Sequence, residues 1–174
     1  CAKALDEFLT LAYWYESRLP VVITRLFNTV GPRQTGQYGM VVPNFVRQAL
    51  KGAPITVYGD GDQSRCFAHV SDITRCLADL MNCRPARGTI VNVGNDEEVS
   101  IRQLAERVKT LTASHSDIVL IPYEEAYGEG FDDMRRRVPD LKRANALVGY
   151  TPTRCLDEIL VDVIQYERSR MSSE

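Results

Sequence analysis

The 174-residue sequence lacks any long apolar run, and its positive and negative charges nearly balance. No stretch approaches the ~20 consecutive apolar residues that cross a bilayer, and no basic segment followed by a signal-like apolar core opens the chain. A formal net charge of −2 provides no bulk attraction to nucleic acid or to anionic lipid. We therefore expect a cytoplasmic protein that binds neither nucleic acid nor a membrane.

The five cysteines lack the spacing of a zinc site or a disulfide framework. They are odd in number, scattered along the chain and never part of a CxxC pair. Only two histidines could serve as the base of a catalytic thiol. We expect no metal site, and we interpret the cysteines as small buried or half-buried side chains.

Two signatures of nucleotide-phosphate binding are also missing. No GxGxxG follows any predicted strand, and GxxxxGK[ST] occurs nowhere in the chain. If the chain serves a nucleotide cofactor, the loop that binds the cofactor phosphates is not in this sequence.

What is present is a globular composition with alternating strands and amphipathic helices. Hydrophobic residues make up 44% and charged residues 25% of the chain, and its length suits one domain. The periodicity predicts helices over residues 3–17, 43–51, 73–80, 100–111, 140–149 and 156–168. It predicts strands over 21–31, 89–95 and 118–123, and a short strand that opens the segment 55–65. This order indicates an α/β fold with a partly parallel sheet, in which 21–31 is the one fully buried strand.

Local signals place several helix starts. Asp72 and Asp140 are predicted N-caps, and Ser100 with Gln103 forms a predicted capping box. His69 invites a catalytic interpretation, but we interpret it as a packing element at the entry of a helix.

Five ordered segments resemble the C-terminal half of the extended short-chain dehydrogenase/reductase family: AKALDEFLTLAY, RLFNTVGPR, ITVYGDGDQSRCFAHVSD, the RRRVPD run and the final helices. Within it the chain resembles the NAD-dependent nucleotide-sugar epimerases, dehydratases and decarboxylases. The resemblance implies the C-terminal portion of a Rossmann-type fold, with residues 1–174 as a single unit. In it, 1–52 and 89–113 would be sheet-side elements, and 53–88 and 114–174 mainly a substrate-binding lobe.

The family's catalytic signature, Tyr-x-x-x-Lys, places both side chains on one helical face. Lys3 matches the lysine, so the tyrosine would fall two positions before Cys1. The resemblance implies NAD as the cofactor of the full-length family, but we expect this chain alone neither to bind NAD nor to catalyse. Lys3 would then be vestigial, and the alternative is an ordinary exposed lysine.

The resemblance also assigns residues to a UDP-sugar. Asn28, Arg65 and Arg137 match side chains that bind the diphosphate, a task suited to amide donors and guanidinium groups. Asn44 and Gln48, four apart on one helical face, match nucleotide contacts. Gln48 could instead be a solvent-facing helix residue.

Two further positions complete the assignment. Tyr58 matches the position beside the uracil, with a half-buried strand aromatic as the alternative. Arg33 either approaches the sugar or braces its loop.

The sequence is compatible with more than one reaction and more than one partner. The loop 123–140 resembles that of UDP-glucose 4-epimerases, so we expect the substrate-binding portion of such an enzyme, inactive alone. UDP-glucuronate decarboxylase or sugar dehydratase is the alternative, and a non-catalytic UDP-sugar-binding or self-associating module is a third. We expect homo-oligomers through the first helix or the exposed edge of strand 21–31, or pairing with a separate N-terminal half.

Overall fold

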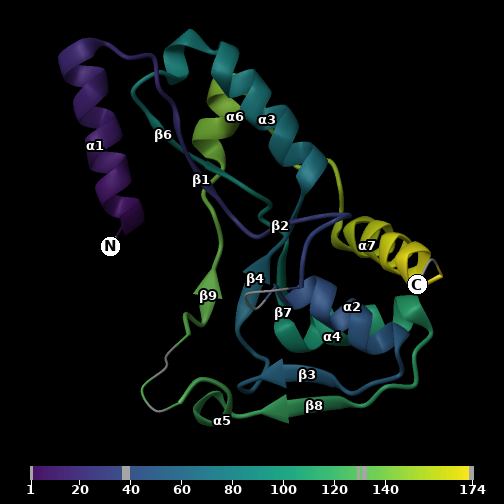
Figure 1. Ribbon diagram of the computed structural model, residues 1–174. Helices are drawn as coiled ribbons and strands as arrows, with labels where there is room; N and C mark the ends of the chain where they lie inside the picture. Colours follow the sequence, from purple (N-terminus) through teal and green to yellow (C-terminus); the bar gives the residue numbers. More distant parts are fainter. Residues whose placement is uncertain (1, 37–39, 129, 131–132, 173–174) are drawn as a thin grey trace.

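The computed structural model describes residues 2–36, 40–128, 130 and 133–172, and Figure 1 shows the arrangement of their helices and strands. The helices are α1 (Ala2–Ser17), α2 (Val41–Leu50), α3 (Val70–Asn82), α4 (Ile101–Thr112), α5 (Tyr123–Tyr127), α6 (Lys142–Val148), α7 (Leu156–Met171) and the short 3₁₀ helix η1 (Arg84–Ala86). The strands are β1 (Ile23–Leu26), β2 (Thr29–Val30), β3 (Ile55–Tyr58), β4 (Ser64–Cys66), β5 (Ala68–His69), β6 (Ile90–Val93), β7 (Glu98–Ser100), β8 (Ile118–Ile121) and β9 (Arg136–Arg137). The expected α/β class is confirmed.

Most strand pairs are parallel. β1 pairs with β6, β2 with β5, and β3 with β8, each in parallel. β4 lies between β7, which is antiparallel to it, and β9, which is parallel. Short parallel pairs between helices are what the alternation of elements predicts.

The expectation of one buried strand over 21–31 is wrong. The segment divides into β1 and β2 at Asn28, whose φ of +22° lies outside the extended region. β1 is also only half covered, since Leu26 at its end is 47% exposed. A run of β-branched and apolar residues predicts extended backbone, but it does not reveal a change of partner strand in the middle of the run.

Two hydrophobic clusters form the core. In the first, α2, α4 and α7 pack together against β3, with Ile55, Leu104 and Leu160 fully buried. In the second, α3 and α6 pack around β6. Figure 1 shows these as a lower and an upper group of elements, joined where β1, β2 and β4 meet.

α1 lies apart from both clusters, beside the β1–β6 pair (Figure 1). None of its residues is buried, and its large apolar side chains Leu5, Phe8 and Leu9 are exposed. Its contact with the rest of the chain includes Trp14, whose ring leaves room only for glycine at Gly88, where the φ of +72° also favours that residue. Self-association through this helix stays a prediction.

The cysteines are partly as expected. Cys66 and Cys76 are buried and Cys83 is half-buried, but Cys155 is exposed, and Cys1 lies outside the described residues. Burial raises the pKa of the Cys66 and Cys76 thiols to about 11, which keeps them protonated and unreactive. No helix in the described part of the chain is long and apolar enough to cross a membrane.

The expected capping box of Ser100 and Gln103 is confirmed. The expectation for Asp140 is wrong, because the N-cap of α6 is Leu141, although the Asp140 carboxylate accepts a hydrogen bond from the Lys142 amide. The expectation for Asp72 is wrong. The N-cap of α3 is His69, whose Nδ1 accepts from the Ser71 amide at 3.2 Å.

Asp72 instead ties α3 to the segment before α7. Its carboxylate is 1% exposed and accepts hydrogen bonds from the Thr153 amide (2.9 Å), the Thr153 hydroxyl (2.6 Å) and the Arg154 amide (3.3 Å). Burial alone would raise the pKa of Asp72, but these hydrogen bonds outweigh it and leave the pKa below its ordinary value. The carboxylate therefore stabilises the fold in its ionised form.

We expect Asp72→Asn to lower the free energy of unfolding at neutral pH by about 1–3 kcal/mol, because donors that the carboxylate accepts lose a partner. The wild-type contribution is present above the unfolded pKa of about 4 and is lost as the pH falls through the lower folded pKa. Urea unfolding at pH 7 and at pH 3 should therefore show a smaller loss of stability on acidification for the variant than for the wild type. Asp79→Asn, on an exposed position of the same helix, is the control. An equal acid-induced loss in Asp72→Asn and wild type would contradict the assignment.

Candidate functional site

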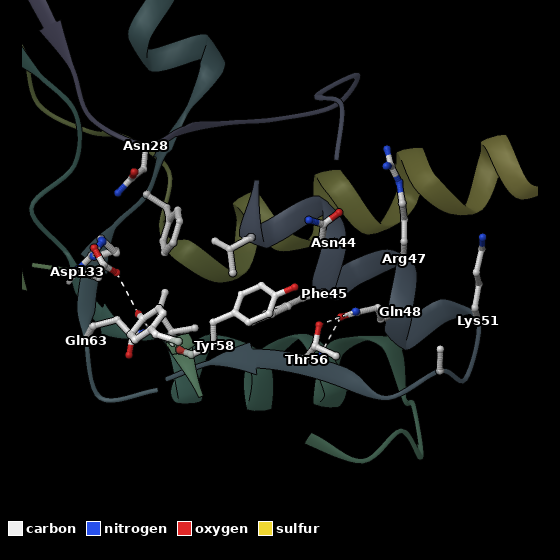
Figure 2. A pocket seen from close by; sticks show the side chains of 16 residues that line it. Asn28, Asn44, Phe45, Arg47, Gln48, Lys51, Thr56, Tyr58, Gln63 and Asp133 are labelled. Atoms are coloured by element: carbon white, nitrogen blue, oxygen red, sulfur yellow. Dashed lines mark hydrogen bonds and ion pairs between the residues drawn. The ribbon is translucent and has the colours of Figure 1, made fainter. Parts of the chain in front are cut away.

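A cavity of about 460 Å³ lies between α2, the end of β3 and the start of β4 (Figure 2). Sixteen residues line it: Asn28, Val41, Asn44, Phe45, Arg47, Gln48, Lys51, Ala53, Thr56, Tyr58, Gln63, Arg65, Phe67, Ile101, Tyr123 and Asp133. Five of the seven expected substrate residues are among them, namely Asn28, Asn44, Gln48, Tyr58 and Arg65. They come from four separate parts of the chain that the fold brings together.

α2 forms one wall. Asn44 and Gln48 lie one helical turn apart and both line the cavity. The Gln48 side-chain amide forms two hydrogen bonds to Thr56 of β3. Its Nε2 donates to the Thr56 hydroxyl at 2.8 Å, and its Oε1 accepts from the Thr56 amide at 3.1 Å. Gln48 is thus neither solvent-facing nor wholly available, since one N–H and one acceptor position remain for a ligand.

Aromatic rings form the floor. Tyr58, at the end of β3, is 39% exposed and lies in the middle of the cavity with Phe45 of α2 near it (Figure 2). The exposed part of the Tyr58 ring suits stacking with a flat ligand group, whereas Phe45 is only 3% exposed.

Asn28 lies at one end of the cavity (Figure 2). Its Nδ2 donates to the Cys66 carbonyl at 2.9 Å, which fixes the side chain beside the start of β5. Because this hydrogen bond fixes the plane of the carboxamide, it also fixes the direction of the second N–H, which could donate to a ligand at this end of the cavity.

Arg65 is the most enclosed cation of the site, with a side chain that is 11% exposed. Its Nη2 donates to Asp133 Oδ1 at 2.6 Å, and its Nη1 donates to the carbonyls of Ser64 (2.7 Å) and Met134 (2.8 Å). These bonds take three of the five guanidinium donors and hold the group in one orientation.

Tyr123 extends this network. Its hydroxyl donates to Asp133 Oδ2 at 3.1 Å and accepts from Gln63 Nε2 at 2.8 Å. Gln63 Nε2 also donates to the Tyr58 carbonyl at 2.9 Å. Burial, and then the neighbouring Asp133 carboxylate, raises the pKa of Tyr123 to about 12, so the phenol stays a neutral donor at physiological pH.

The cavity carries three cations and one carboxylate. Arg47 pairs with Glu167 at 2.8 and 3.0 Å, which ties α2 to α7, and Arg65 pairs with Asp133. Lys51 lies at the end of the cavity opposite Asn28 and Asp133 (Figure 2). A flat ring joined to an anionic group is the kind of ligand that this combination of rings, amides and cations can bind.

The other expected residues lie elsewhere. Lys3 and Arg137 line a second cavity of about 520 Å³ between α1 and β1, and the Arg137 guanidinium lies over the Phe27 ring at 5.6 Å. Arg33 is exposed on a turn with φ +70° and lines neither cavity. Of the seven expected residues, the structure therefore brings five together in the first cavity, and their roles in binding a ligand stay a prediction.

Sequence reasoning missed Gln63, Tyr123 and Asp133. Gln63 and Asp133 lie in turns or loops, and nothing local in the sequence indicates that they meet. Asp133 follows an acidic residue and precedes three arginines, a pattern that predicts a balanced surface loop. Its pairing with a cation 68 positions away is visible only in the fold.

The family model described as GDP-mannose 4,6 dehydratase matches residues 1–163. UDP-glucuronic acid decarboxylase 1 of Danio rerio is 41% identical over 164 residues, which are 94% of this chain and 37% of that protein. The chain thus spans well under two thirds of this relative's length.

Solved structures agree on the fold. The UDP-glucose 4-epimerase of Thermotoga maritima with UDP-glucose has a TM-score of 0.88 and 27% identity, over 98% of this chain and 53% of its own. The UDP-glucuronic acid 4-epimerase of Bacillus cereus, in complex with UDP-glucuronic acid and NAD, has a TM-score of 0.84 and 25% identity, over 94% and 50%.

The double contact of Gln48 with Thr56 generates a prediction about stability. We expect Gln48→Ala to lower the free energy of unfolding by about 1–2 kcal/mol, because the Thr56 amide and hydroxyl lose their partner. Lys51→Ala, an exposed neighbour one turn along, should change it by less than about 0.5 kcal/mol. Urea unfolding followed by circular dichroism measures both, and equal stability of the two variants would contradict a structural role for Gln48.

Proposed function

The chain belongs to the family described as GDP-mannose 4,6 dehydratase, and on that premise we propose that it binds the nucleoside diphosphate part of a UDP-sugar in the cavity between α2 and β3. Asn28 and Arg65 would bind the diphosphate, and Asn44, Gln48 and Tyr58 would contact the uridine. The observation that carries the proposal is the convergence of these five residues, expected from sequence alone, on one cavity with an oriented guanidinium at one end.

The second cavity suits the sugar. Phe27 lines it, and the next residue, Asn28, lines the first cavity. Arg65 and Arg137 are register partners in the β4–β9 pair, and each faces a different cavity. A ligand whose diphosphate lies at Arg65 would then extend toward Arg137 and Lys3, which line the second cavity together with Asp6 and the Arg25–Glu7 ion pair.

Among the possible reactions we propose that of a UDP-glucuronic acid decarboxylase, within the complete protein. The decarboxylase relative is 41% identical, compared with 27% and 25% for the two epimerase structures. A UDP-glucose 4-epimerase, which the loop 123–140 favours, has less support than this alternative. The cations Arg137 and Lys3 also suit a sugar that carries a carboxylate.

NAD is the cofactor found in the epimerase of Bacillus cereus. This sequence contains no GxGxxG turn of the kind that receives the pyrophosphate of a dinucleotide, and the expectation that this chain alone does not bind NAD stays a prediction.

The direct test is calorimetric titration of the purified chain with UDP. We expect Arg65→Ala to weaken UDP binding by about 1.5–3 kcal/mol, which is about ten- to hundredfold in Kd, because a charge-assisted contact to the diphosphate is lost.

The matched control is Arg107→Ala, which removes an arginine that pairs with Asp157 and Glu97 away from the cavity. It should leave the Kd of UDP unchanged. Equal UDP affinity of wild type and Arg65→Ala would contradict the assignment of the diphosphate, and absence of UDP binding to the wild type would contradict the proposed function.

A decarboxylase of this kind should prefer a UDP-sugar that carries a carboxylate. We expect UDP-glucuronic acid to bind more tightly than UDP-glucose, and Arg137→Ala to reduce that difference, because the guanidinium attracts the sugar carboxylate. Competition titrations against UDP measure both ligands. Tighter binding of UDP-glucose, or an Arg137→Ala variant that keeps the full difference, would favour the epimerase alternative.

A further inference from the structure

The Asp133 carboxylate is an unexpected group in a cavity proposed to bind an anion. It lines the same cavity as Arg65, its side chain is 32% exposed, and its Oδ1 lies 2.6 Å from Arg65 Nη2. The Arg65 guanidinium is therefore already paired with a carboxylate of the same chain before any ligand binds.

A positioning role for Asp133 is not required by the geometry. Arg65 Nη1 is already held by the carbonyls of Ser64 and Met134 at 2.7 and 2.8 Å. Two backbone acceptors on one guanidinium nitrogen fix the plane of the group without any carboxylate. What Asp133 adds is a negative charge beside the most enclosed cation of the cavity.

The second oxygen of Asp133 is also fixed. The Tyr123 hydroxyl donates to Oδ2 at 3.1 Å, and Gln63 Nε2 holds that hydroxyl at 2.8 Å. The Tyr123 ring packs on the turn at Gly59, where an added Cβ would lie 2.5 Å from Cε2. Tyr123 and Gln63, which also line the cavity, thus hold the carboxylate in contact with Arg65.

We infer that Asp133 is an internal competitor for the anionic group of the ligand, which lowers the affinity of the cavity for a diphosphate by neutralising Arg65. This inference rests on the proposed function of the cavity. A diphosphate that approaches Arg65 either displaces the carboxylate or is repelled by it, and both effects weaken binding. Asp133 would therefore set how readily the nucleotide is released, a property that a site with unopposed cations would lack.

The test compares UDP and uridine as probes of wild type and Asp133→Asn by calorimetric titration. Asparagine keeps the shape of the side chain and can still accept from Arg65, but it removes the charge. We expect UDP to bind about three- to tenfold more tightly to Asp133→Asn, the range for a like charge at a partly exposed site. The Kd of uridine, which carries no phosphate, should be unchanged, and the gain for UDP should shrink at high salt.

Two further variants separate charge from structure. Tyr123→Phe removes the hydrogen bond that fixes Asp133 but leaves its charge in the cavity, so it should not tighten UDP binding. Asp157→Asn makes the same change in net charge at an exposed position that lies outside the cavity, and it should leave both ligands unaffected.

Each other outcome overturns the inference. If Asp133→Asn binds UDP with the same affinity as the wild type, or more weakly, the carboxylate positions Arg65 and does not oppose the ligand. A gain shared by uridine, or an equal gain in Tyr123→Phe, would mean that a change in cavity shape is responsible. Failure of the wild type and all variants to bind UDP would overturn the proposed function itself, and the inference with it.

Discussion

The hydrogen bond from the Asn28 carboxamide to the Cys66 carbonyl is the contact on which the rest of the arrangement depends. At 2.9 Å, together with the bond from the Ala68 amide to the Asn28 carbonyl at 3.1 Å, it joins the end of β1 to the β4–β5 segment. β1 belongs with β6 and the second hydrophobic cluster, whereas β4 leads to β3 and the first. One residue in an unusual backbone conformation thus connects the two clusters, and its side chain also lines one end of a cavity whose apolar lining comes from the first cluster.

The sequence predicts the elements of this fold better than their pairing. The capping box at Ser100 and the helical periodicity of α2, α4 and α7 are local signals, and these helices form close to the expected bounds. β4, β5, β7 and β9 are two or three residues long, too short for any periodicity to register. The break at Asn28 and the burial of Asp72 both follow from partners far away in the chain, so no local pattern predicts them.

The residues of the candidate site also divide into those that a local pattern places and those that only the fold brings together. Asn44 and Gln48 could be placed on one wall from their spacing, because a helix converts sequence distance into geometry. Asn28, Tyr58 and Arg65 were found through resemblance to a family, and their convergence on one cavity is a property of the fold. Gln63, Tyr123 and Asp133 were missed because the network that joins them crosses between a turn, a short helix and a loop. Arg137 was assigned to the diphosphate, yet its side chain faces the second cavity, since register partners on neighbouring strands need not serve one ligand group.

The electrostatics of the cavity follow from how its cations are partnered. The Arg47–Glu167 pair has a carboxylate that is 3% exposed and lies on α7, outside the cavity lining, so its charge is used to hold two helices together. In the Arg65–Asp133 pair both side chains line the cavity. An anion that binds there therefore competes with the Asp133 carboxylate for the Arg65 guanidinium. A buried pair that serves packing resists separation because either partner alone is costly to bury. A pair whose carboxylate is partly exposed can separate at lower cost, because water replaces the lost partner. The same kind of contact, an arginine beside a carboxylate, therefore stabilises the fold at one wall of the cavity and adjusts ligand affinity at the other.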